Sequence, residues 1–128
     1  MKLKLFLGLI VLMSIGACKK GKNDVSLKGL WIVENSVYKE YENNTLTLTE
    51  TEPGNGTTVD FQDNGNVVIK EASGSIESYP YQIISATVVK IDGDDMEVRN
   101  LNSSTVSLFR RDDWAPGEYS EILLNLKR

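Results

Sequence analysis

The side chains that most often carry out catalysis are scarce in this chain. It contains no histidine and a single cysteine, Cys18. Without histidine, the commonest general acid–base and metal ligand is missing, and neither a Ser-His nor a Cys-His nucleophile pair can form. Carboxylates, tyrosines and lysines are what remains for chemistry. We therefore predict that the protein is not an enzyme and has no catalytic residues.

The densest group of potential metal ligands is formed by Asp92, Asp94 and Asp95 around Gly93. A Ca²⁺ ion needs about six to eight oxygen ligands. This run lacks the ligand string and the closing glutamate of an EF-hand loop, and a hairpin turn with solvated acids accounts for it. We predict no metal site and no diffusible cofactor.

The residues before Cys18 give the cysteine a specific chemistry. Lys2 and Lys4 precede an apolar run, Leu5–Ile15, of 11 residues. That run is too short to cross about 30 Å of hydrocarbon as a helix, but it suits a secretory signal. The small residues directly before the cysteine resemble the lipobox of bacterial lipoproteins. This resemblance implies cleavage before Cys18 and a thiol that carries diacylglycerol, often with a further acyl chain such as palmitate.

Residues 1–17 are thus predicted to be a lipoprotein signal peptide, which could form a helix, and residues 18–26 a polar, lipidated tether. Two or more acyl chains give stable membrane anchoring. Lys19, Lys20 and Gly21 do not form the acidic export signal found beside the cysteine in many Bacteroidetes surface lipoproteins. We expect a cell-envelope protein anchored in the outer membrane and facing the periplasm. The alternative is an ordinary signal peptide followed by a chance cysteine.

The mature chain, residues 18–128, would have 111 residues and suits one small domain. Removing Lys2 and Lys4 leaves 12 Lys and Arg against 18 Asp and Glu, a net charge of −6. Binding to nucleic acid needs a basic face, so none is expected. We predict a monomer whose partners are the membrane and either a small apolar ligand or an envelope protein.

Alternating apolar and polar residues, separated by turn sequences, predict an all-β domain of about eight or nine strands. Asn64-Gly65 between two apolar runs is a hairpin signal. Pro80 suggests an edge strand or a bulge, and residues 111–117 are predicted to be a polar loop. The predicted strands are residues 31–38, 45–49, 58–61, 67–69, 78–84, 87–91, 96–99, 106–108 and 119–126. An up-and-down barrel would remove the exposed sheet edges.

The start of this region resembles a known family. Gly29-Leu30-Trp31 is similar to the Gly-x-Trp signature of lipocalins and calycins, and the hairpin Val59–Val67 and the later hairpins fit the same pattern. With the lipobox, residues 27–128 resemble the lipocalin-like lipoproteins of Bacteroidetes. The resemblance implies a lipocalin-like barrel in which Gly29 and Trp31 have a structural role, with the Trp31 ring closing the barrel base.

Strand alternation also predicts which side chains point into the barrel. The inward set comprises Trp31, Val33, Leu46, Leu48, Val59, Phe61, Val67, Ile69, Tyr81, Ile83, Val89, Ile91, Met96, Val98, Val106, Leu108, Ile122, Leu124 and Leu126.

Two functions fit these observations. The first is binding of a small hydrophobic or amphipathic ligand in a cavity at the open barrel end, and its candidate pocket residues are Tyr38, Phe61, Tyr79, Tyr81, Met96 and Arg99. The second is an envelope structural or protein-interaction role with a solid core and no cavity. Trp114, an aromatic residue in the predicted polar loop, would then contact the partner.

Overall fold

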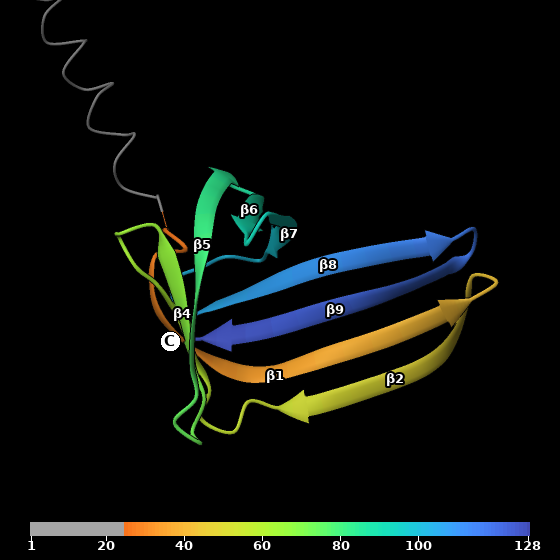
Figure 1. Cartoon of the computed structure of the whole chain (residues 1–128), viewed down its shortest axis with the longest axis horizontal. Coiled ribbons are helices and arrows are strands. Elements are labelled where there is room, and N and C mark those ends of the chain that lie inside the picture. Colours follow the sequence, from red (N-terminus) through yellow and green to blue (C-terminus); the bar gives the residue numbers. More distant parts are fainter. Residues whose placement is uncertain (1–24) are drawn as a thin grey trace, which may run out of the picture.

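The computed structural model describes residues 25–128, so the predicted signal peptide, Cys18 and most of the predicted tether lie outside the described residues. The described part is all-β, with nine strands and no helix (Figure 1). The strands are β1 (Gly29–Glu42), β2 (Thr45–Pro53), β3 (Thr58–Phe61), β4 (Asn66–Lys70), β5 (Ile76–Ser85), β6 (Val88–Ile91), β7 (Asp94–Arg99), β8 (Thr105–Ala115) and β9 (Glu118–Lys127). No helix in residues 25–128 is long and apolar enough to span a bilayer.

Eight of the strands close into an antiparallel barrel. The order is β1-β3-β4-β5-β6-β7-β8-β9, and pairing of β1 with β9 closes the ring. Every neighbouring pair is antiparallel, and short hairpins join the consecutive strands from β3 to β9. The predicted small antiparallel barrel is therefore confirmed.

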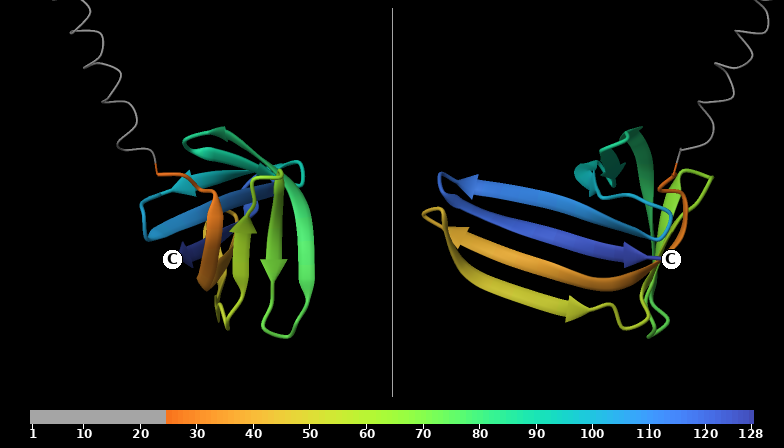
Figure 2. Two further views of the ribbon diagram at one scale, coloured as in Figure 1. Left: turned by 90° about the vertical axis from the view of Figure 1, so that its left-hand side faces the viewer. Right: turned by 180° about the vertical axis from the view of Figure 1, so that it is seen from behind.

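The ninth strand, β2, lies outside the ring. Residues 29–32 of β1 pair with β3, whereas residues 35–42 pair with β2 on the same side. β8 and β9 are also long, so four strands run past the barrel in the order β2-β1-β9-β8 (Figures 1 and 2). We call this part the projecting sheet: residues 35–42 of β1, all of β2, residues 110–115 of β8 and residues 118–123 of β9.

The barrel interior is filled by apolar side chains. The buried set is Leu27, Trp31, Val59, Phe61, Val67, Val89, Val98, Val106, Leu108 and Leu126. Val33, Ile69, Tyr79, Tyr81, Ile91, Met96, Leu101 and Leu124 are partly buried against it. Burial of such side chains, each worth about 1.5–3 kcal/mol, is the main driving force for folding in residues 25–128.

Four residues of the predicted inward set are exposed instead: Leu46 (48%), Leu48 (36%), Ile83 (39%) and Ile122 (37%). Leu46 and Leu48 belong to β2, which is outside the barrel, and Ile122 lies in the projecting part of β9. Ile83 lies on β5, just before a register shift between Ile83 and Ser85. Alternation assigns faces only within an unbroken strand, and the register shift in β2 puts Leu46 and Leu48 on opposite faces. It also does not show whether another element covers a face.

Two further predictions about local structure were wrong. Residues 111–117 are not a polar loop, because β8 continues to Ala115 and β9 begins at Glu118. Ion pairs from Arg110 to Asp112 and from Arg111 to Asp113 accompany these strand residues. Pro80 is not on an edge strand, since β5 lies between β4 and β6, and it is not at a bulge, since the register shift of β5 lies between Ile83 and Ser85. It stands where β5 changes partner, pairing with Asn66 while Tyr81 pairs with Ile91.

Candidate functional site

The six predicted pocket residues do not gather around one cavity. Phe61 is 1% exposed and packs edge-on against the Tyr81 ring at 5.2 Å between ring centres. The Tyr81 hydroxyl donates a hydrogen bond to the Gln62 carbonyl oxygen. These two residues are therefore part of the packed barrel wall and core.

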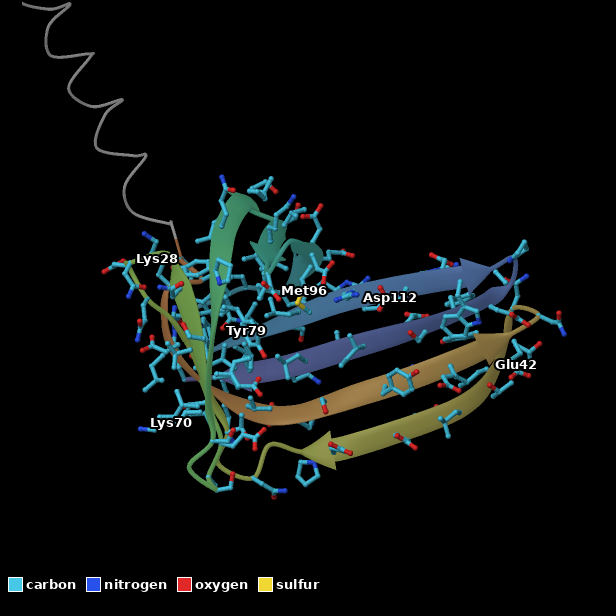
Figure 3. The ribbon with its side chains drawn as sticks, viewed as in Figure 1. Lys28, Glu42, Lys70, Tyr79, Met96 and Asp112 are labelled. Carbon is cyan, nitrogen blue, oxygen red and sulfur yellow. The ribbon has the colours of Figure 1, made fainter. Side chains whose placement is uncertain are left out.

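The other four predicted residues are spread along the molecule. Tyr79 and Met96 are partly buried near the junction of the barrel and the projecting sheet (Figure 3). A hydrogen bond to Glu77 and loss of hydration raise the pKa of Tyr79. Arg99 stacks on the Phe109 ring at 3.7 Å, and Tyr38 lies in the projecting sheet.

Trp31 is fully buried, and its indole N–H donates to the Leu27 carbonyl oxygen at 2.8 Å. The Arg128 guanidinium lies 3.9 Å from the centre of the Trp31 ring. Arg128 also donates hydrogen bonds to the carbonyl oxygens of Ser26, Lys28 and Ser103. The Arg128 side chain thus ties both ends of the described chain to the β7–β8 connection, next to the buried tryptophan.

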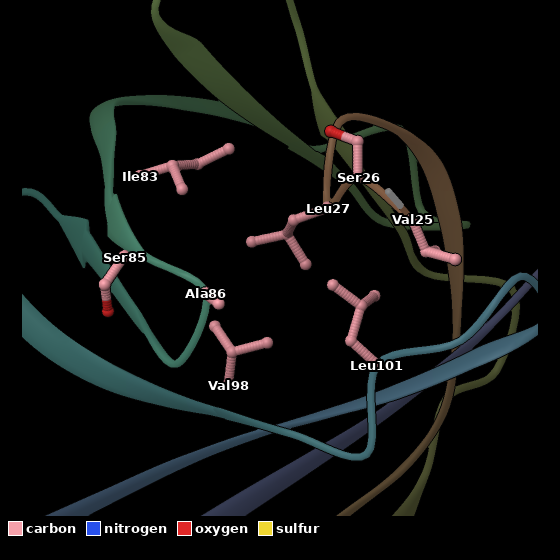
Figure 4. Close-up of a pocket in the computed structure, with 8 residues that line it drawn as sticks. All are labelled: Val25, Ser26, Leu27, Ile83, Ser85, Ala86, Val98 and Leu101. Atoms are coloured by element: carbon pink, nitrogen blue, oxygen red, sulfur yellow. The ribbon is translucent and has the colours of Figure 1, made fainter. Parts of the chain in front are cut away.

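An apolar hollow of about 290 Å³ lies between the entering segment, the β5–β6 turn and the β7–β8 connection (Figure 4). Its lining is Val25, Ser26, Leu27, Ile83, Ser85, Ala86, Val98 and Leu101. None of these residues was among the predicted pocket residues. Val25 and Leu27 precede the first strand, so alternation along strands could not identify them.

The two faces of the projecting sheet differ in charge. Strand alternation and the registers of β1 with β2 and β9, and of β8 with β9, assign each side chain to a face. One face continues the line of barrel-interior residues Leu108 and Leu124. Its charged residues are Glu40, Glu42, Glu50, Glu52, Asp112, Glu118 and one cation, Arg110, which gives a net charge of −5. We call it the acidic face.

The opposite face is electrically balanced. Lys39 and Arg111 are matched by Asp113 and Glu121. Tyr41 and Tyr119 stack at 4.5 Å between ring centres, and the Arg111 guanidinium covers the Tyr119 ring at 3.6 Å. Arg111 on this face therefore has both an acidic and an aromatic neighbour.

The one cation of the acidic face, Arg110, does not balance its acids. Arg110 contacts Asp112 at 2.9 Å and Asp94 of β7 at 3.0 Å. Within residues 25–128, none of the five remaining acids, Glu40, Glu42, Glu50, Glu52 and Glu118, takes part in an ion pair. Figure 3 shows Glu42 at the far end of the sheet and Asp112 along β8.

The side chain of Tyr38 lies close to two acids of the acidic face, Glu40 and Glu50. Its hydroxyl donates to Glu40 at 2.8 Å. That hydrogen bond, loss of hydration and the negative charges of Glu40 and Glu50 raise the pKa of Tyr38, while a hydrogen bond with Ser120 opposes the change. These neighbours come from β1, β2 and β9, in agreement with the face assignment.

Trp114 stands near the tip of the projecting sheet and is 56% exposed. Asp113 pairs with Tyr119 and Ala115 with Glu118, so Trp114 is the extra residue of a β-bulge, a feature that re-aims a side chain. The backbone N–H of Asn44 donates to the Gly117 carbonyl oxygen at 2.9 Å, which joins the β1–β2 and β8–β9 tips.

Residues 25–128 contain no group of three or more acidic, cysteine or histidine side chains arranged to hold a metal ion. No family model, curated protein or solved structure matches this chain. The candidate sites are therefore defined by the geometry of the projecting sheet and of the apolar hollow.

Proposed function

We propose that this chain is a lipid-anchored envelope protein that binds a protein partner through its projecting sheet. The supporting observation is a four-stranded sheet that extends beyond a filled barrel (Figures 1 and 2). Leu46, Leu48, Ile122 and Trp114 are each at least 36% exposed there. A protein-binding surface commonly combines such apolar and aromatic groups with a polar surround.

A packed barrel suits the role of a rigid support. Trp31, Phe61, Leu108 and Leu126 are each no more than 1% exposed, which gives β1, β8 and β9 a firm base. The same three strands continue into the projecting sheet, so the sheet is held in place by the barrel core. A binding surface built on such strands is positioned more accurately than one built on loops.

The lipid anchor in this proposal comes from the sequence before the described residues. Growth of the host with an alkyne-bearing palmitate should label the wild-type protein, whereas C18S should remain unlabelled and keep its signal peptide. Equal labelling of both proteins would contradict attachment at Cys18.

The partner-binding part is tested by chemical cross-linking in intact cells, followed by purification of the tagged full chain. We expect one host protein to be captured in fixed proportion and its capture to fall at least several-fold in W114A. S73A, an exposed substitution in a barrel turn, is the matched control and should capture normally. Equal capture by W114A and wild type would contradict a role for this part of the sheet.

The apolar hollow favours a second candidate function, binding of a small hydrophobic ligand. Its volume of about 290 Å³ is near the lower end of ligand pockets, roughly 300–1,000 Å³. Native mass spectrometry of protein purified from its host should then show a bound ligand that A86W, which fills the hollow, displaces. Absence of any ligand from the wild-type protein would exclude this function.

A further inference from the structure

The outer edge of β2 is the most accessible backbone in the projecting sheet. β2 ends the strand order, and within residues 25–128 its only neighbour is β1. All nine of its residues are exposed. Unpaired backbone groups on such an edge form a template for another strand. The edge therefore offers hydrogen bonds to a partner in addition to side-chain contacts.

The usable length of this edge is limited at both ends. Thr47 is a bulged residue, because Tyr41 pairs with Leu46 and Glu40 with Leu48. Pro53, which has no N–H, ends the strand. Between them, residues 48–52 keep an unbroken register with β1. A partner strand of about five residues would match this stretch.

The charge of β2 selects the chemistry of that partner. Leu48, Glu50 and Glu52 lie on the acidic face, and Thr49 and Thr51 on the opposite face. A strand beside β2 would place alternate side chains next to Glu50 and Glu52. Lysine or arginine at those positions would be attracted, whereas acidic residues would be repelled.

A second copy of this chain does not meet that requirement. Residues 25–128 carry nine Lys and Arg against 17 Asp and Glu, a net charge of −8. Pairing β2 with β2 of another copy would bring two acidic faces side by side. An anionic membrane surface would be repelled for the same reason.

We infer that the β2 edge binds an extended cationic segment of a partner protein, which adds a strand to the projecting sheet and places alternate Lys or Arg side chains over the acidic face. This inference rests on the proposed function and specifies its partner. The segment would alternate basic residues with β-branched or small polar ones, since its other side chains would lie beside Thr49 and Thr51.

The test uses the lipidated full chain in neutral-detergent micelles and a blocked heptapeptide in which lysines alternate with valine and threonine. Hydrogen exchange measured by mass spectrometry should show at least tenfold slower exchange in the peptic fragments covering β2, with unchanged exchange in β4 and β5. Affinity should fall at least tenfold in E50Q/E52Q and decrease with added salt. D63N/E71Q, which removes two exposed acids of the barrel turns, is the matched control and should bind normally.

Two control peptides separate strand addition from simple charge attraction. Replacing lysine by glutamate should abolish binding, and N-methylation of alternate peptide nitrogens should weaken it at least tenfold without changing its charge. Equal binding of the N-methylated peptide, or no slowing of exchange in β2, would overturn the inference.

Analytical sedimentation of the peptide-free protein is a further test, because it measures whether the protein forms a dimer. A two-fold dimer that protects β2 would also overturn the inference, because a second copy would then occupy the edge. Failure of the peptide to bind would contradict the inference about the β2 edge. Trp114-dependent capture in cells tests the proposed function separately, so the two proposals can fail independently.

Discussion

Arg128 shows how one terminal side chain can stabilise the barrel base. Its guanidinium covers the Trp31 ring and donates to three backbone carbonyl groups, two of which precede β1. Gly29, next to the Arg128 guanidinium, has a φ of +111°, a backbone conformation that favours glycine. The sequence identified Gly29 and Trp31, whereas Arg128 has no local pattern that marks its role.

We predict that R128A lowers the free energy of unfolding by about 1–2 kcal/mol, because hydrogen bonds from a charged group and an exposed cation–π contact are lost. Urea unfolding followed by tryptophan fluorescence measures the change. K127A, one residue away and exposed, is the control and should alter stability by less than about 0.5 kcal/mol. Equal effects of the two substitutions would contradict the role given to Arg128.

Tyr38 provides a pH-dependent signal from the acidic face. The hydrogen bond to Glu40, loss of hydration and the nearby negative charges favour the neutral phenol in the folded state, and this raises the pKa of Tyr38. This contribution to stability is complete below the unfolded tyrosine pKa, about 10, and is lost as pH rises through the folded pKa. We predict that E40Q shifts the Tyr38 titration to lower pH, because the acceptor charge is removed.

Tyrosinate absorbance, taken as the difference between each protein and its Y38F counterpart, isolates this titration. The control is E121Q, whose side chain lies on the opposite face and whose charge helps to raise the pKa of Tyr41. A Tyr38 titration unmoved by E40Q, or moved equally by E121Q, would contradict the face assignment.

At the scale of elements, the turn sequences predicted the hairpins well but did not reveal which strand joins which sheet. Asn64-Gly65 lies between β3 and β4, as expected, because its conformation is determined locally. β2 alternates regularly in sequence, yet it is exposed on both sides. Its placement depends on the length of β1 and on the pairing of β1 with β9, which is distant in the sequence. Residues 111–113 were predicted as part of a loop, because polar strands with two open faces lack an apolar signal.

The connection from β2 to β3 depends on Gly54. A Cβ atom there would lie 1.7 Å from the Val33 carbonyl oxygen. The Gly54 N–H donates to the Glu34 carbonyl oxygen at 3.1 Å, so the chain passes close to the bulged part of β1. This approach brings the chain from the projecting sheet back into the barrel.

We predict that G54A destabilises the fold by about 2–3 kcal/mol, because the backbone must move to relieve the overlap. G74A is a suitable comparison, as a Cβ atom there meets nothing within 4 Å and only its positive φ opposes the substitution. It should cost about 1 kcal/mol. Chemical unfolding of both variants gives the comparison, and a smaller loss in G54A than in G74A would contradict this account.

At the scale of the whole molecule, the structure combines a filled barrel with a sheet that extends beyond it. Of the net charge of −8 on residues 25–128, −5 lies on the acidic face of the projecting sheet. The sequence predicted the barrel and most of its core, because burial produces alternation. It did not predict the projecting sheet as a candidate site, since that site depends on the register of four strands. Trp114 was the one residue of this sheet that the sequence predicted to contact a partner.

The most direct test of partner binding through the projecting sheet is site-specific photo-cross-linking in intact host cells. The photoreactive amino acid would replace Glu52 on β2, Trp114 on β8 or Ser73 in a barrel turn. The account predicts the same host-protein adduct from the two sheet positions and none from Ser73. Adducts from Ser73 alone, or no protein adduct from either sheet position, would contradict it.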